Sequence, residues 1–358
     1  METGMQIVAP ISRVEEIQIL AAAGADELYC SVVSEQWLER FRTSGISRRA
    51  FGNLPAYADL ERAAGLAREQ RVRLSLALNA QQYSAEQLAV MEDIAAHFDD
   101  LGGAAVIAGD ALLIRQLARK NHRFRIHVSS IATCRNSEAA AFFQDLGADR
   151  IIFPRDITIR EMEQIMARVN GMEFEAFVLN DGCAYEEGVC HTIHLPAKLG
   201  GPICLDQYQG SYQRLDGRTL SPEERAALEH NDQEYQNWLW YRFGCGFSVT
   251  REGLPYGPCA LCALPRWQAT GLHAIKIAGR DAPLDRKKKS VEMVQAVRER
   301  LNQPENAVLH FAREIRQQPQ HCDSGRMCFY QDTPTPLKSK AEEQSCDRNS
   351  YQESTPAT

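Results

Sequence analysis

Short apolar segments alternate with helix-like segments along most of the chain, and this alternation limits the folds that the chain can adopt. Runs rich in Val, Ile, Leu and Ala mark short buried strands, and the stretches between them carry apolar residues at helical spacing. The clearest predicted helix is Tyr83–Asp99, with Leu88, Met91 and Ile94 on one face. We predict eight strands, at Gln6–Ala9, Glu27–Val32, Arg73–Leu78, Ala104–Ala108, Arg125–Ser129, Arg150–Phe153, Glu173–Leu179 and His273–Ala278.

Eight strands that alternate with helices predict an α/β fold, a parallel (β/α)8 barrel of the TIM type. A doubly wound open sheet is the alternative. We favour the barrel because the strand count reaches eight and because no Gly-x-Gly-x-x-Gly segment opens a helix after a strand, as a dinucleotide-binding sheet would require. A chain of 358 residues also suits one barrel with additions.

The alternation stops after the seventh predicted strand and resumes only at the eighth. We therefore predict a barrel at residues 5–316 with a cysteine-rich insertion at about 183–262, between strands seven and eight. One helix is expected inside the insertion, at Pro222–Trp240, with Ser221 as its N-terminal cap. Residues 317–358 are rich in Gln, Ser, Pro, Lys and Glu, so we predict a disordered C-terminal tail.

The overall charge and the length of the apolar runs argue against several classes of protein. Lys and Arg number 40 against 47 Asp and Glu, a net charge of −7, which argues against a surface built to coat nucleic acid; RNA binding in a small basic pocket stays open. We find no run of about 18 apolar residues and no signal-peptide pattern, so we expect no membrane span and a cytoplasmic protein. Eleven cysteines in a reducing compartment favour metal-binding or redox roles over disulfides.

Two cysteines, Cys183 and Cys190, follow the seventh predicted strand, and Cys262 shortly precedes the eighth. Because binding residues of such barrels lie at the carboxyl ends of the strands, these thiols can meet at one rim. Thiolates are soft ligands, so the group indicates an iron–sulfur cluster or a zinc ion. The alternative is that each thiol packs as a small apolar group.

Further cysteines compete for the remaining ligand position. Spacing alone does not choose among three candidates: Cys204, Cys245 and Cys259. The pair Cys259-x-x-Cys262 by itself suits zinc or a redox pair. Three cysteines near the C-terminus are interpreted as spare thiols of the tail, although the first two could fold over a cluster: Cys322, Cys328 and Cys346.

Polar residues at the predicted strand ends indicate a site for a small anion. The candidates for binding it are Asn79, Arg155, Lys276 and Arg280. Three of them are cations, and charge-assisted hydrogen bonds from cations suit an anionic small-molecule cosubstrate. The alternative is that each cation pairs with a nearby acid, such as Asp156, Asp281 or Glu175, and only shapes the barrel mouth. The basic run Arg286–Lys289 is interpreted as the solvated start of a helix rather than an RNA-binding patch.

Two motifs carry a resemblance to a known family. The first is similar to the signature of the peptidase U32 family and consists, in order, of Glu175, Phe177, Cys183, Gly188 and Cys190. The second resembles that family's later hallmark and consists of Cys262, Gly271, Lys276, Gly279 and Arg280. The segments Ala22–Tyr29 and Gly147–Arg155 resemble the family's repeated strand entries, so the resemblance covers roughly residues 6–300.

The resemblance implies a barrel that binds one oxygen-sensitive [4Fe–4S] cluster through Cys183, Cys190, Cys204 and Cys262. It also implies a part in oxygen-independent hydroxylation of an aromatic or nucleobase ring, either of ubiquinone type or in RNA. The chain departs from the family pattern at Ala278, where a Glu is usual, and at Leu179–Gly182, where a His-containing segment is usual.

Three functional hypotheses follow from the sequence. The first is the hydroxylating iron–sulfur enzyme; the second is a non-enzymatic partner subunit that docks through the aromatic-rich insertion at 195–258. A zinc-binding variant is the third. The family's peptidase label finds no support in the chain, which contains neither His-Glu-x-x-His nor Gly-x-Ser-x-Gly.

Overall fold

The computed structural model describes most of the barrel and parts of the insertion. The described residues are 4–41, 46–47, 52–183, 186–190, 210–239, 257–325 and 327–335. Within them, no helix is both long enough and apolar enough to cross a membrane.

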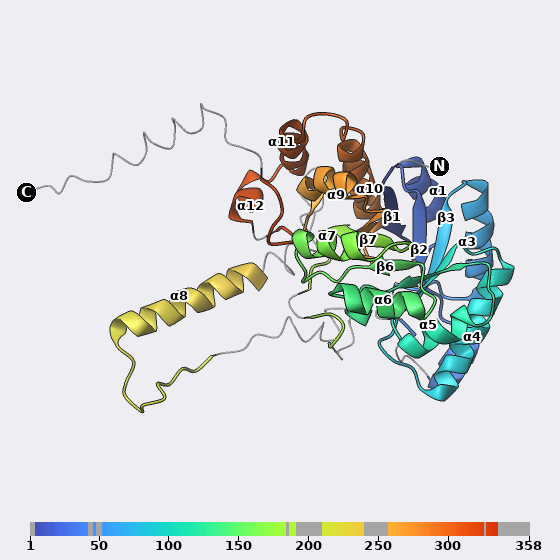
Figure 1. Cartoon of the computed structure of the whole chain (residues 1–358), viewed down its shortest axis with the longest axis horizontal. Coiled ribbons are helices and arrows are strands. Elements are labelled where there is room, and N and C mark those ends of the chain that lie inside the picture. Colours follow the sequence, from blue (N-terminus) through green and yellow to red (C-terminus); the bar gives the residue numbers. More distant parts are fainter. Residues whose placement is uncertain are drawn as a thin grey trace, which may run out of the picture.

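Eight parallel strands form a closed barrel in chain order (Figure 1). The barrel closes where β1 pairs with β8, with Gln6 opposite Ala274 and Val8 opposite Lys276. The predicted (β/α)8 barrel is confirmed, and the open-sheet alternative is wrong. The strands are β1 (Gln6–Pro10), β2 (Glu27–Cys30), β3 (Arg73–Leu78), β4 (Ala105–Ala108), β5 (Arg125–Val128), β6 (Arg150–Ile152), β7 (Glu173–Leu179) and β8 (Ala274–Ile277).

Helices surround the barrel, as Figure 1 shows. One of them, α2, buries the side chain of Trp37 completely. The helices are α1 (Glu16–Ala22), α2 (Glu35–Phe41), α3 (Tyr57–Glu69), α4 (Ala85–Asp100), α5 (Ala111–Ala118), α6 (Ser137–Asp145), α7 (Ile159–Arg168), α8 (Pro222–Leu239), α9 (Leu264–Thr270), α10 (Leu284–Arg298), α11 (Glu305–Arg316) and α12 (Pro319–Ser324).

The strands are buried on both faces, as expected for a parallel sheet that is covered by helices. Every residue of β2, β4 and β8 is buried. The predicted apolar face of α4 is confirmed, since Leu88, Met91 and Ile94 are buried, and a capping box between Ser84 and Gln87 fixes the start of this helix.

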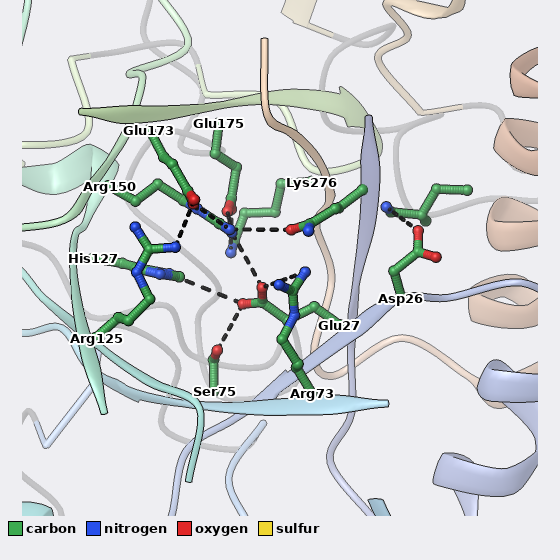
Figure 2. A network of polar contacts seen from close by, with 12 residues as sticks. Asp26, Glu27, Arg73, Ser75, Arg125, His127, Arg150, Glu173, Glu175 and Lys276 are labelled. Carbon is green, nitrogen blue, oxygen red and sulfur yellow. Dashed lines mark hydrogen bonds and ion pairs between the residues drawn. The ribbon is translucent and has the colours of Figure 1, made fainter. Parts of the chain in front are cut away.

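A network of charged side chains fills the N-terminal half of the barrel (Figure 2). Arg150 lies at its centre: Nη1 donates to Glu27 Oε2 at 3.1 Å and to Glu175 Oε2 at 3.0 Å, and Nη2 donates to Glu173 Oε2 at 2.8 Å. Lys276 Nζ pairs with the other oxygen of Glu175 at 2.7 Å. Each of these charges has an opposite charge in contact, which is the condition for burying it at low cost.

The long insertion lies between β7 and β8, as predicted. Its helix α8 begins at Pro222, and Ser221 forms the expected cap, since its Oγ accepts from Glu224 N at 3.2 Å. In Figure 1 this helix lies apart from the barrel.

Residues beyond 316, the predicted end of the barrel, also pack on it. Helix α12 lies within the predicted tail, and Phe329 and Tyr330 are buried. The hydroxyl of Tyr330 accepts from Phe177 N at 3.0 Å and donates to Phe177 O at 3.2 Å, so two aromatic residues anchor a segment of polar composition. The rest of the predicted tail, residues 336–358, lies outside the described residues, together with Cys346.

Candidate functional site

The carboxyl ends of the strands form a polar mouth, which is where barrels of this type carry their chemistry. The side chains or backbone segments that contribute to it follow several strands: Asn79 follows β3, Ser129 follows β5, Arg155 follows β6, Asn180 follows β7 and Arg280 follows β8. Asn79 Nδ2 donates to Ser129 Oγ at 3.3 Å. The other amide atom, Asn79 Oδ1, is buried and has no hydrogen-bond partner in the described part of the chain. A buried acceptor without a partner indicates a position where a ligand can donate.

The predicted cations of the mouth differ in their surroundings. Lys276 is buried, pairs with Glu175 and lies 4.0 Å from the ring centroid of Tyr29. Arg280 is also buried and donates to Asn53 Oδ1 at 3.3 Å and to Ser47 Oγ at 3.2 Å. Lys276 therefore belongs to the buried charge network, whereas Arg280 contacts Ser47 and Asn53.

Arg155 contacts the cysteine loop at the mouth, of which the structure describes residues 183 and 186–190. Its guanidinium lies 3.5 Å from the ring centroid of Phe177 and forms an ion pair with Glu187. On the other side of the loop, Gln81 Nε2 donates to the carbonyl oxygen of Gly188. The loop between Cys183 and Cys190 is thus attached to residues that follow β3 and β6.

The surroundings of Gly188 give a reason for the glycine at this position of the motif. A Cβ added there would lie 1.9 Å from Thr133 Cγ2 and 2.5 Å from Ile131 O. A side chain at this position would force the loop to shift, because its backbone lies directly against the segment after β5.

The chain turns sharply between β7 and Cys183. Asn180 and Asp181 have φ angles of 68° and 47°, in the left-handed region that costs energy for residues other than glycine. Asn180 Nδ2 donates to Ser290 Oγ at 2.9 Å, and Asp181 pairs with Arg286 at 3.5 Å, both on α10. The predicted solvated helix start is therefore wrong at Arg286, which is buried because it anchors this turn.

The mouth holds a tyrosine and a thiol that are kept neutral. Burial raises the pKa of Tyr29, Arg280 opposes the rise and Asp181 adds to it. Burial likewise raises the pKa of the Cys30 thiol to about 12. A nucleophilic thiol needs a lowered pKa, so Cys30 is not suited to that role.

The structure describes three of the four predicted cluster ligands and places them in two regions. Cys183 and Cys190 lie half-buried on the loop at the mouth, and Cys204 lies outside the described residues, as does its competitor Cys245. Cys262 lines a separate pocket together with Cys259, Cys322 and Cys328. Among the described residues, no three His, Cys, Asp or Glu side chains are arranged to hold a metal ion as they stand.

Sequence comparison identifies the family. The profile of peptidase family U32 matches residues 12–337. The chain belongs to this family. Two curated relatives are the tRNA hydroxylation protein P of Escherichia coli (strain K12), 32% identical over 91 residues, and the tRNA hydroxylation protein P1 of Bacillus subtilis (strain 168), 20% identical over 185 residues.

These relatives match only in part. The first alignment covers 25% of this chain and 20% of the E. coli protein, and the second covers 52% of this chain and 41% of the B. subtilis protein. Among solved structures, the U32 peptidase Mk0906 is 18% identical with a TM-score of 0.40, over 49% of this chain and 68% of that one. The U32 chain described here therefore spans less than half the length of the curated relatives it matches.

Proposed function

We propose that this U32 protein takes part in oxygen-independent hydroxylation of an aromatic or nucleobase ring, of ubiquinone type or in RNA, in the cytoplasm. The observation that carries the proposal is the loop from Cys183 to Cys190, which bears the family's cysteine motif and is fastened over the barrel mouth through Glu187 and Gly188. The similarity to two proteins named for tRNA hydroxylation supports the same class of reaction.

The proposed cofactor is a [4Fe–4S] cluster, which supplies electron transfer when bound. Half-buried thiols on a glycine-containing loop suit such a group, since cluster ligands must be cysteine thiolates that are screened from water. Cys183, Cys190 and Cys204 are three of the proposed ligands. The sequence motif makes Cys262 the fourth, and Cys245 and Cys259 are the alternatives to Cys204.

The mouth is proposed to bind an anionic cosubstrate. Arg155 and Arg280 bring positive charge to the strand ends, and Asn79 Oδ1 offers an acceptor that no described residue uses. Lys276 lies beneath the mouth in its ion pair with Glu175 and supports it from there. Asn79, Arg155 and Arg280 are proposed to bind and orient the cosubstrate, and the residue that acts on the substrate is not assigned.

Proteolysis is not proposed. Besides Cys30, the thiol of Cys134 has its pKa raised to about 12 by burial. A thiol protease requires the opposite shift, together with a histidine base in contact.

The test is product formation in cells grown without oxygen. A strain that lacks the gene is supplied with the wild type, with Cys183→Ala, or with Cys134→Ala as a buried thiol outside the motif. Mass spectrometry of digested RNA and of extracted quinones should show a hydroxylated product with the wild type and Cys134→Ala and none with Cys183→Ala. Equal product with Cys183→Ala, or no difference between the strain with and without the gene, would contradict the proposal.

A second candidate function is that of a partner subunit that docks through the insertion. Large apolar side chains are exposed in its described part: Leu215 is fully exposed, and Tyr212 and Tyr235 are 43% and 46% exposed. Such aromatic surface is typical of protein interfaces. Replacing residues 210–239 by a short Gly-Ser linker should then abolish co-purification of a partner while metal content survives. Loss of product with an unchanged oligomeric state would instead make the segment a lid.

A further inference from the structure

Four cysteines from two distant parts of the chain line one pocket: Cys259, Cys262, Cys322 and Cys328. We propose that they form a second metal site, separate from the loop at the barrel mouth, which binds one tetrahedral zinc ion. The site goes beyond the proposed hydroxylation function. It takes Cys262 out of the proposed ligand set of the cluster and leaves Cys183, Cys190 and Cys204 there.

Backbone pairing brings the first and last of these cysteines together. Cys259 forms an antiparallel bridge with Leu179 at the end of β7 and a parallel bridge with Cys328. Its N–H donates to Met327 O at 2.7 Å, and its carbonyl accepts from Phe329 N at 2.9 Å. Directly opposed residues of paired strands place their side chains on the same face, so both thiols lie on one side of this small ladder.

The segment Cys259-x-x-Cys262 has the hydrogen bonding of a metal-binding turn. Leu261 N donates to Cys259 Sγ at 3.4 Å, and Cys262 lies in the 3-10 turn Leu261–Ala263 that follows. A backbone N–H aimed at sulfur favours the thiolate form, which is the form that binds metal. Two cysteines at this spacing are a usual half of a zinc site.

The other half comes from the C-terminal segment. Cys322 lies in α12, and Gly325, with a φ of 67°, reverses the chain after it. Gly325 N donates to Cys322 O at 3.3 Å and Cys328 N donates to Gly325 O at 3.1 Å, so the turn returns Cys328 to the same pocket. In the sequence, the close spacing of Cys322 and Cys328 indicated that they could share a site. Composition alone had placed both cysteines in a disordered tail.

The charges around the pocket suit a thiolate-rich ion. Zinc with four thiolates carries a net charge of −2, and two arginines of α11, Arg313 and Arg316, line the same pocket. These two positive side chains offset part of the negative charge that the ion and its thiolates would carry.

The pocket has room for an ion. The space between its lining residues admits water-sized groups, which suffices for a single metal ion. The sulfurs line this space without being drawn in to ligand distance. Side-chain rotations about a zinc ion would bring them to roughly 2.3 Å from the metal. The ion would tie α12 and the segment after it to the end of β7, from which the cysteine loop departs.

The test measures zinc and iron in the full chain, purified without oxygen, by mass spectrometry of the metals. The wild type should hold about one zinc per chain. Zinc should be lost in Cys322→Ser/Cys328→Ser and in Cys262→Ser, while Cys183→Ala should keep zinc and lose iron. If Cys183→Ala kept its iron, only the proposal of the cluster would be contradicted. The zinc content of the other variants tests the second site independently.

A second measurement guards against loss of zinc through misfolding. Cobalt added to the zinc-free wild type should give the visible absorption of a tetrahedral four-thiolate site, and Cys322→Ser/Cys328→Ser, if folded by circular dichroism, should not. Four outcomes would overturn the proposal: zinc retained in the double variant, iron in this pocket, loss of iron instead of zinc in Cys262→Ser, or a disulfide between Cys259 and Cys328 in the protein as purified.

Discussion

The two ends of the barrel use charge differently. In the N-terminal half, Arg150 contacts three carboxylates and Lys276 completes the network, so the charges compensate one another. At the mouth, Asn79 Oδ1 has no partner among the described residues, and two consecutive residues after β7 adopt left-handed conformations. Compensated charge is typical of a scaffold, although both ring nitrogens of His127 in the lower half also lack a hydrogen-bond partner among the described residues. Local backbone strain is tolerated where a ligand or cofactor binds. We therefore expect changes in the lower half to act mainly on stability and changes at the mouth mainly on binding.

The largest effect should come from breaking the network at its centre. Arg150→Met leaves Glu27 and Glu175 buried without their common partner, and we expect a loss of about 3–5 kcal/mol in the free energy of unfolding. The matched control is Arg125→Met, because Arg125 pairs with Glu173 from a side chain that is 41% exposed. An exposed pair contributes about 0–1 kcal/mol. Denaturant unfolding measures both, and equal losses would contradict the distinction.

A smaller loss of stability is expected where the cysteine loop contacts the barrel. Gly188→Ala places a methyl group against Thr133 and Ile131, so the loop must shift, at a cost of about 1–3 kcal/mol. The iron content per chain of Gly188→Ala should fall strongly, although the protein stays folded. Gly65→Ala is the control, since a Cβ at this position of α3 meets nothing within 4 Å. That change should stabilise the protein by about 0.5–1 kcal/mol. Full iron content in Gly188→Ala would show that the loop does not position the cluster.

The free energy of unfolding should depend on pH through His127, which lies in the charge network of the lower half of the barrel. Burial lowers the pKa of His127 far below its usual value, and Arg150 and Arg125 lower it further. His127 therefore stays neutral in the folded state while the unfolded chain takes up a proton below pH about 6.5. Stability should decline as the pH falls from 7 to 5.

The acid groups of the network act at lower pH. Burial opposes ionisation of Glu175, but Lys276 and Arg150 outweigh it and lower its pKa. Its contribution is present above the unfolded pKa of about 4.3 and is lost as the pH falls through the folded value. In His127→Gln, the decline between pH 7 and 5 should shrink while the loss below pH about 4.3 remains. An unchanged decline above pH 5 would mean that other groups cause it.

The smallest effect on stability is expected at the mouth. Asn79→Ala removes an oxygen without a partner in the described structure and one long hydrogen bond to Ser129 Oγ, so the free energy of unfolding should change by no more than about 1 kcal/mol. Product formation should nevertheless fall, and it should fall further in Asn79→Asp if the cosubstrate is an anion. A large loss of stability in Asn79→Ala would place this residue in the scaffold instead.

The sequence predicted the barrel well because the strands are short, apolar and regularly spaced. It could not distinguish charged side chains that lie inside the barrel from those that lie at its mouth. Lys276 was assigned to the mouth, whereas it lies in the buried network, because a lysine on a strand looks the same in sequence whether its partner is a ligand or Glu175. Arg150 lay in a predicted strand and gave no signal, since its partners come from strands far away in the chain.

The loop and the C-terminal segment show the same limit. The cysteine spacing identified the motif, but the contacts of Gly188 with Thr133 and of Arg155 with Glu187 depend on how separate connections meet in space. Because the composition after residue 317 is polar, the sequence did not indicate that Phe329 and Tyr330 pack on the barrel. Their burial brings the cysteines of this segment to the pocket.

The most direct test of the assignment of the mouth is the iron and sulfide content of protein purified without oxygen, for the wild type and Cys183→Ala, with the visible spectrum. The account predicts about four irons and four sulfides per wild-type chain, with a broad absorption that fades in air, and neither in the variant. A wild type without iron, or a variant that keeps the full cluster, would contradict the claim that the mouth of the barrel holds the cofactor.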